Sequence, residues 1–220
     1  DALPIYQPHS GKLFIVSGSS GAGKGTICKR LIEESDPGRI ELSVSMTTRK
    51  ARVGEEEGRS YYFVSRERFL QEVKNDGFIE YAEVYENYYG TPKEKVLDKL
   101  SQGVDIVLEI DIQGAMKVKE AYPEGVFIFI LPPSMSILRK RLTGRGTDSL
   151  KTIDMRLAHT LDELSYIEEY DYVVVNGELE EAVSRVKAIV VAEHSKVTEN
   201  IKRISVGRSE ERRVGKECRS

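Results

Sequence analysis

The sequence predicts an α/β fold, with a mostly parallel central sheet flanked by helices. Continuous apolar runs suited to buried strands alternate with helix-compatible stretches along most of the chain. Between residues 41 and 92 this alternation gives way to short segments of alternating polarity, which favour a small mixed-β lobe inserted into the core. A glycine-rich stretch directly follows the first apolar run. Together these features predict one α/β core with one inserted lobe.

The core strands are predicted where apolar residues run without interruption. These runs lie at residues 12–17, 105–110, 126–131 and 172–175. Helical patterns occupy residues 24–34, 112–121, 134–142, 149–168 and 178–194. A strand followed by a helix and another strand normally forms a right-handed crossover, which places the two strands parallel. We therefore expect these strands to form one parallel sheet.

The inserted lobe is predicted to hold shorter elements. Strands are expected at residues 41–45, 61–64 and 78–84, with a helix at 67–74. Another helix is expected to begin after Thr91-Pro92 and to run to about residue 101. Threonine is a good N-cap, and proline suits the first helical position because it has no N–H to leave unpaired.

Composition limits the class of protein. The chain has 220 residues and a net charge of −3, which suits one compact α/β domain and argues against a nucleic-acid binder. No apolar run approaches the roughly 18 residues of a membrane span. Cys28 and Cys218 are the only cysteines, so we expect a reducing cytoplasm and a buried Cys28. Residues 208–220 contain one large apolar residue, Val214, and are expected to be a disordered, non-native tail.

The glycine-rich stretch predicts a phosphate-binding loop. It contains Gly18, Ser19, Ser20, Gly21, Ala22, Gly23, Lys24, Gly25 and Thr26. Its position between a strand and a helix is the context in which G-x-x-x-x-G-K binds nucleotide phosphates through backbone N–H groups, the helix N-terminus and the lysine. The alternative is an ordinary Gly/Ser-rich turn, which the lysine and the spacing disfavour.

One position departs from the usual loop. Residue 25 is glycine where serine or threonine normally supplies a hydroxyl to Mg²⁺. Thr26 is expected to do this directly or through a water. Asp111 follows the strand at 105–110, where such enzymes place an acid near Mg²⁺, although a structural carboxylate is the alternative. The ending G-K-G-T resembles that of nucleoside monophosphate kinases.

A second anion site is predicted in the inserted lobe. Arg49 and Arg52 follow a hydroxyl-rich extended run and can fork onto one phosphate, with Tyr61 and Tyr89 donating hydroxyls. The alternative is that both arginines are solvated surface charges.

Six motifs in order make the resemblance specific. They are S-V-S-M-T-T-R-x-x-R, G-R-S-Y-Y-F-V, F-I-E-Y, N-Y-Y-G-T, L-E-I-D-I-Q-G and L-x-G-R-G-T. Together they resemble the guanylate kinase family over about residues 12–191. The resemblance implies a P-loop NTPase core at 11–40 and 93–192, a GMP-binding lobe at about 41–92 and a small helical lid at about 139–158. Residues 193–207 would end the last helix. The resemblance also implies transfer of the ATP γ-phosphoryl group to GMP with Mg²⁺.

The resemblance assigns the GMP site as follows. Arg49, Arg52, Tyr61 and Tyr89 would hold the phosphate, and Ser45 and Thr91 would contact guanine O6. Glu80 would face the guanine edge, where the adjacent N1–H and N2–H₂ donors match a two-oxygen acceptor. Glu109 would lie near the N2 amino group, where the family often has Asp.

The resemblance also assigns the ATP side. Arg141, Arg145 and Arg156 look like the lid arginines that close over the ATP phosphates and, with Lys24, neutralise charge on the transferred group, while Arg49 and Arg52 would place the attacking oxygen. Asn176 would lie near adenine. Two alternatives stay open: another nucleoside monophosphate kinase such as adenylate kinase, and a non-catalytic guanylate-kinase-like binding module. The sequence leaves open whether the protein is a monomer or a homo-oligomer.

Overall fold

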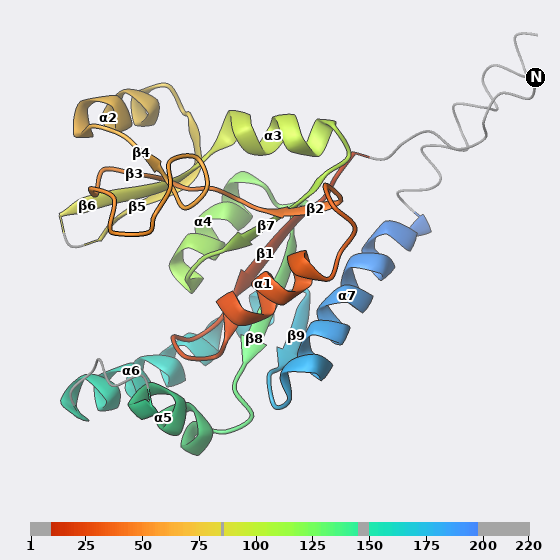
Figure 1. Ribbon diagram of the computed structural model, residues 1–220. Coiled ribbons are helices and arrows are strands. Elements are labelled where there is room, and N and C mark those ends of the chain that lie inside the picture. Colours follow the sequence, from red (N-terminus) through yellow and green to blue (C-terminus); the bar gives the residue numbers. More distant parts are fainter. Residues whose placement is uncertain (1–9, 85, 145–149, 198–220) are drawn as a thin grey trace, which may run out of the picture.

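A five-stranded parallel sheet forms the centre of the protein (Figure 1). The computed structural model describes residues 10–84, 86–144 and 150–197. The sheet has the order β2-β7-β1-β8-β9, and every neighbouring pair is parallel. Its strands are β1 (Leu13–Ser17), β2 (Ile40–Leu42), β7 (Asp105–Glu109), β8 (Val126–Leu131) and β9 (Tyr172–Val175). The predicted α/β core is confirmed.

Helices cover both faces of this sheet, which is why its inner strands are continuous apolar runs. On one face, α1 (Lys24–Glu33) and α7 (Leu179–Ser195) share an apolar cluster with the strands. On the other, α3 (Lys93–Ser101) and α4 (Ile112–Ala121) do the same. Cys28 of α1 is 1% exposed, as predicted, and burial raises the pKa of its thiol to about 12.

A second, four-stranded sheet forms the inserted lobe, with the order β4-β3-β6-β5. It contains β3 (Met46–Thr47), β4 (Tyr62–Phe63), β5 (Phe78–Val84) and β6 (Asn87–Pro92), with α2 (Arg66–Lys74) beside it. The β3–β4 pair is parallel and the other two pairs are antiparallel, which confirms the expected mixed sheet. Phe69 of α2 stacks on Phe78 and Tyr88, so aromatic packing joins the helix to the sheet.

Two predictions for this region are wrong. The strand expected at residues 41–45 of the inserted lobe is instead β2 (Ile40–Leu42), which pairs with β7 in the main sheet, and residues 43–45 lead without strand structure to β3 of the second sheet. Thr91 is not a helix cap. It lies in β6, the N-cap of α3 is Pro92, and the Thr91 hydroxyl donates to Glu80 instead. The local Thr-Pro pattern was outweighed by strand pairing with residues distant in the chain.

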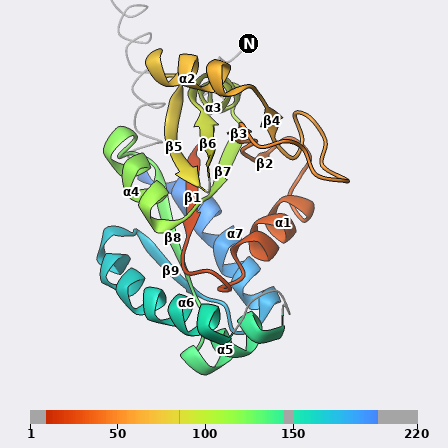
Figure 2. The ribbon, with the colours of Figure 1, turned by 90° about the vertical axis from the view of Figure 1, so that its left-hand side faces the viewer.

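Two further helices, α5 (Met135–Gly144) and α6 (Leu150–Glu163), pack on each other through a separate apolar cluster. The helix expected at 149–168 is shorter, because a 3₁₀ turn, η1 (Leu164–Glu169), replaces its last part. Figures 1 and 2 place the α5–α6 pair and the second sheet toward opposite ends of the molecule, with the β1–α1 loop between them. None of the helices in the described ranges is long and apolar enough to cross a membrane.

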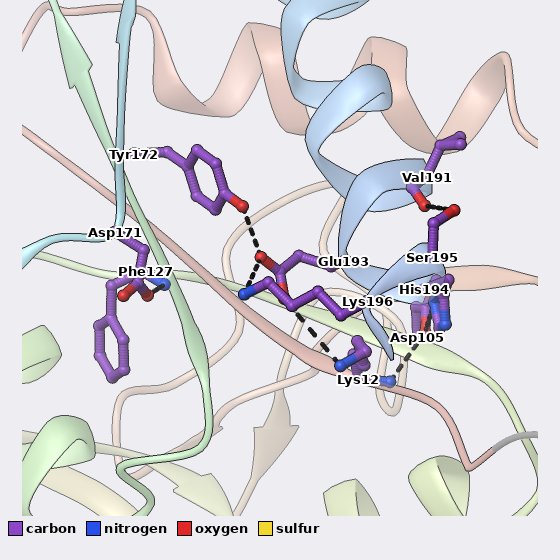
Figure 3. A network of polar contacts seen from close by, with 10 residues as sticks. All are labelled: Lys12, Asp105, Phe127, Asp171, Tyr172, Val191, Glu193, His194, Ser195 and Lys196. Carbon is purple, nitrogen blue, oxygen red and sulfur yellow. Dashed lines mark hydrogen bonds and ion pairs between the residues drawn. The ribbon is translucent and has the colours of Figure 1, made fainter. Parts of the chain in front are cut away.

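A polar network fastens the end of α7 to the beginnings of the strands (Figure 3). Glu193, 2% exposed, accepts hydrogen bonds from the Tyr172 hydroxyl at 2.5 Å and from Lys196 at 2.6 Å. Burial alone favours the neutral acid, but these bonds hold the pKa of Glu193 below its ordinary value. His194 lies 2.8 Å from Asp105 at the start of β7. The predicted disordered tail at 208–220 and most of the expected helix end at 193–207 lie outside the described residues.

Candidate active site

The loop between β1 and α1 has a backbone that requires glycine. Gly18 has φ 137°, and a Cβ there would lie 2.2 Å from the Ile130 carbonyl oxygen. Gly23 has φ 97°, and its Cβ would lie 2.3 Å from Asn176 Nδ2. Both φ values lie in the region that L-residues with a side chain rarely adopt. The loop then leads into the N-terminus of α1 at Lys24, as in a phosphate cradle.

Lys24 folds back over this loop. Its Nζ donates to the carbonyl oxygens of Gly18 at 2.6 Å and Ser19 at 3.1 Å. Burial lowers the pKa of Lys24, while the negative charges of Glu109, Glu163 and Asp111 oppose that shift. These contacts hold the Lys24 ammonium beside the loop, where it can exchange its two carbonyl partners for the oxygens of a bound phosphate.

A cavity of about 300 Å³ lies beside the lysine, lined by Ser20, Gly21, Gly23, Lys24, Gly25, Thr26 and Glu109. A Cβ at residue 25 would lie 3.2 Å from both carboxylate oxygens of Glu109. Glycine at this position therefore leaves room for the Glu109 carboxylate next to the loop. Burial raises the pKa of Glu109, and the charge of Lys24 opposes this.

A second cavity, of about 570 Å³, shares Gly21, Gly23 and Thr26 with the first and continues toward Asn176. Asn176 is 5% exposed, and its Nδ2 donates to the Ala22 carbonyl oxygen at 2.7 Å. Arg141 of α5 donates to the Asn176 carbonyl oxygen at 2.9 Å. The amide of Asn176 thus supports the loop backbone while the residue also lines the cavity; its predicted contact with adenine stays a prediction.

Arg156 of α6 reaches the same loop, with its Nη1 2.9 Å from the Ser20 hydroxyl. The structure therefore brings two of the three predicted lid arginines, Arg141 and Arg156, to the phosphate-binding loop. Arg145, the third, lies outside the described residues.

Glu80 of β5 is half-buried and accepts a hydrogen bond from the Thr91 hydroxyl at 2.9 Å. Burial raises the pKa of Glu80; the bond from Thr91 opposes this, and the charge of Asp111 adds to it. Lys117 of α4 also donates to the Tyr81 carbonyl oxygen at 3.1 Å, which holds β5 against α4.

Arg49 lies beside both predicted tyrosines. Its guanidinium is 5.5 Å from the Tyr61 ring centre, and the Tyr61 and Tyr89 rings are 6.0 Å apart. Arg52 is exposed, and its backbone N–H donates to Glu55 Oε2 at 2.8 Å. The Ser45 carbonyl oxygen accepts the Tyr62 N–H at 2.9 Å, next to the paired strands β3 and β4. Within the described ranges, no hydrogen bond links the Ser45 hydroxyl to Glu80.

Two predicted metal-site residues have different surroundings. Thr26 lines the cavity beside Lys24. Asp111 is the N-cap of α4, and its Oδ1 accepts the Gly114 N–H at 2.7 Å. The structural role expected as the alternative for Asp111 therefore uses one of its two carboxylate oxygens. In the part of the chain that the structure describes, no three His, Cys, Asp or Glu side chains are grouped to hold a metal by themselves.

The sequence reasoning missed two acidic residues. Glu55 binds Arg49 through both carboxylate oxygens, at 2.8 and 3.0 Å. The sequence signal that could have predicted this pair is an acidic residue six positions after Arg49 and directly after Gly54. Glu163, the last residue of α6, couples electrostatically to Lys24; burial raises its pKa and Lys24 opposes this. No local pattern points to Glu163, because α6 and the loop are distant in the chain.

Comparisons with known proteins agree with this geometry. The family model described as guanylate kinase matches residues 10–193. A guanylate kinase from Caldanaerobacter subterraneus subsp. tengcongensis is 53% identical over 190 residues, covering 86% of this chain and 91% of its own. One from Clostridium acetobutylicum is 52% identical over 187 residues, covering 85% and 88%. A crystal structure of guanylate kinase from Anaplasma phagocytophilum matches with a TM-score of 0.67 and 41% identity, covering 87% and 90%.

Proposed function

Since the chain belongs to the guanylate kinase family and is an ATP:GMP phosphotransferase, we propose which of its residues perform the reaction. The observation that carries the proposal is that Arg141 of α5 and Arg156 of α6 both bond to the phosphate-binding loop, while the second sheet holds the bonded Glu80–Thr91 pair. The loop and the arginines bind ATP, and the second sheet binds GMP.

On the ATP side, the backbone N–H groups of residues 18–26 hold the phosphates, and Lys24 turns from its two loop carbonyls to the β- and γ-phosphates. Arg141 and Arg156 are already at the loop and stabilise the negative charge on the transferred group, with Arg145 as a third donor. The cavity that continues to Asn176 holds the nucleoside.

On the GMP side, Glu80 accepts the N1–H and N2–H₂ donors of guanine, and Thr91 orients it through the bond at 2.9 Å. Adenine has an acceptor at N1, so a half-buried carboxylate here would face a lone pair and reject it. Arg49, Arg52, Tyr61 and Tyr89 bind the phosphate, with Ser45 toward O6 and Glu109 toward the N2 amino group. This selectivity distinguishes the site from that of an adenylate kinase.

Mg²⁺ fits the residues at the loop. Thr26 and Asp111 supply hard oxygen donors near Lys24, and Mg²⁺ commonly binds through one or two such groups together with substrate phosphates. When bound, the ion would neutralise charge on the β- and γ-phosphates. Because residue 25 is glycine, Thr26 is the next residue along the chain that can offer a hydroxyl to the ion.

The reaction needs positioning more than acid–base chemistry. The acceptor is already a phosphate dianion, so no residue has to remove a proton from it. Arg49 and Arg52 place the attacking oxygen, while Lys24 and the arginines of α5 and α6 stabilise the charge that moves. A binding module would not require these cations around a complete phosphate-binding loop.

The Glu80→Gln variant tests this assignment. The amide presents one acceptor and one donor, so it mismatches one of the two guanine donors. We expect kcat/KM for GMP to fall by about two orders of magnitude, with the KM for ATP nearly unchanged. Glu83→Gln is the matched control, because Glu83 lies on the same strand but is exposed. Unchanged GMP kinetics in Glu80→Gln would remove Glu80 from the base site.

A further inference from the structure

Glu55 makes a forked ion pair with Arg49 inside the second sheet's anion site. Arg49 Nη2 donates to Glu55 Oε1 at 2.8 Å, and Nη1 donates to Oε2 at 3.0 Å. Both side chains are mostly covered, with 14% of Arg49 and 21% of Glu55 exposed. The hydrogen bond with Glu55 is the main cause that raises the pKa of Arg49, with Tyr89 contributing a further bond.

The carboxylate belongs to a built turn. The Glu55 N–H donates to the Arg52 carbonyl oxygen at 3.1 Å, and Gly54 adopts φ 86°, which closes the turn. In return, the Arg52 N–H donates to Glu55 Oε2 at 2.8 Å. Glu55 is therefore held by the backbone between Arg52 and itself, and it is not a mobile surface acid that meets Arg49 by chance.

The ion pair uses only one edge of the guanidinium. Glu55 binds the end formed by Nη1 and Nη2, and the second hydrogen of Nη1 goes to the Lys50 carbonyl oxygen at 2.8 Å. A guanidinium has five N–H donors, and these contacts use three of them. Nε–H and the second N–H of Nη2 form the remaining edge, which the Tyr89 hydroxyl shares and at which an oxyanion can bind. The neighbouring Tyr61 ring and Tyr89 hydroxyl lie around this same guanidinium.

We propose that Glu55 is a positioning residue that fixes Arg49 so that its Nε–Nη2 edge faces the GMP phosphate. This rests on the proposed function of the second sheet. A flexible arginine loses side-chain conformational entropy when it binds an anion. Because Glu55 already restricts Arg49 in the folded protein, most of this entropy is lost before GMP binds. If Glu55 instead competed with the phosphate for Arg49, removing its charge would lower the KM for GMP, whereas the positioning role predicts that the KM rises.

The experiment measures GMP and guanosine separately in Glu55→Gln. The KM for GMP should rise about tenfold, whereas the inhibition constant of guanosine, which has no phosphate, and the KM for ATP should stay within twofold of wild type. In an Arg49→Met background, Glu55→Gln should add little further loss, because its effect acts through Arg49. Glu56→Gln is the matched control: Glu56 is the next residue, exposed, and pairs with Arg59 at the surface.

Three results would overturn the proposal. A lower KM for GMP would make Glu55 a competitor of the phosphate. Equal losses for GMP and guanosine, with a lower melting temperature, would make it a structural support of the lobe. Unchanged constants would give it no role in binding. Failure of the wild-type protein to prefer GMP over guanosine would instead contradict the proposed phosphate site, so the two failures are distinguishable.

Discussion

Replacing Gly23 by alanine should destabilise the protein through one defined collision. Gly23 has φ 97°, which costs an L-residue with a side chain about 1–2 kcal/mol. The new Cβ would lie 2.3 Å from Asn176 Nδ2, so the amide has to move and lose its 2.7 Å bond to the Ala22 carbonyl oxygen. Leaving these buried groups unpaired costs about 1–3 kcal/mol more.

The sum is a loss of about 2–5 kcal/mol in the free energy of unfolding. For a chain of this size, each kcal/mol corresponds to roughly 2–4 °C, so the melting temperature should fall by about 4–20 °C. Thermal unfolding without ligand measures this directly. Gly177→Ala is the control, because Gly177 lines the same cavity and a Cβ there meets nothing within 4 Å.

A double variant isolates the collision. In an Asn176→Ala background, Gly23→Ala has no amide to displace, so it should cost only the backbone strain of about 1–2 kcal/mol. The reasoning is refuted if Gly23→Ala costs the same in both backgrounds, or if it costs less than about 1 kcal/mol in the wild-type protein.

Three other changes have defined outcomes. Lys24→Met should lower kcat about 100- to 1,000-fold in a folded protein, and near-normal turnover in the coupled assay would contradict the phosphate-cradle role. The lowered pKa of Glu193 stabilises the fold above about pH 4.5, its ordinary value, and this contribution is lost as pH falls. In Glu193→Gln, the free energy of unfolding, measured by urea titration at several pH values, should therefore fall less on acidification than in wild type, and an equal fall in both proteins would contradict this. In a Cys218→Ser background, the buried Cys28 thiol should resist alkylation at pH 8 until the protein unfolds, so rapid labelling of the folded protein would contradict its raised pKa.

Much of the main sheet is predictable because its signals are local. The strands at 126–131 and 172–175 and the helix at 112–121 match the structure residue for residue. In each of these segments, the spacing of apolar residues reflects burial, of the strands within the sheet and of the helix against it. The phosphate-binding loop is likewise local, since its glycines, lysine and flanking strand are contiguous.

The remaining features depend on contacts between distant segments. β6 contains Tyr88, Tyr89 and the Thr91-Pro92 pair, and it became a strand through pairing with β3 and β5. The bond from Asn176 to Ala22 joins residues 154 positions apart, which no spacing rule predicts. Glu55 is close to Arg49 in the chain, but only the turn geometry shows that the two side chains meet.

The most direct test of the whole account is ADP release with ATP and Mg²⁺, comparing GMP, AMP, CMP and UMP as acceptors. The Glu80–Thr91 pair predicts rapid turnover with GMP and at most a small fraction of that rate with the other three. Comparable turnover with AMP would contradict the base-reading role of the second sheet, and absence of turnover with GMP would contradict the catalytic assignment of the loop and its arginines.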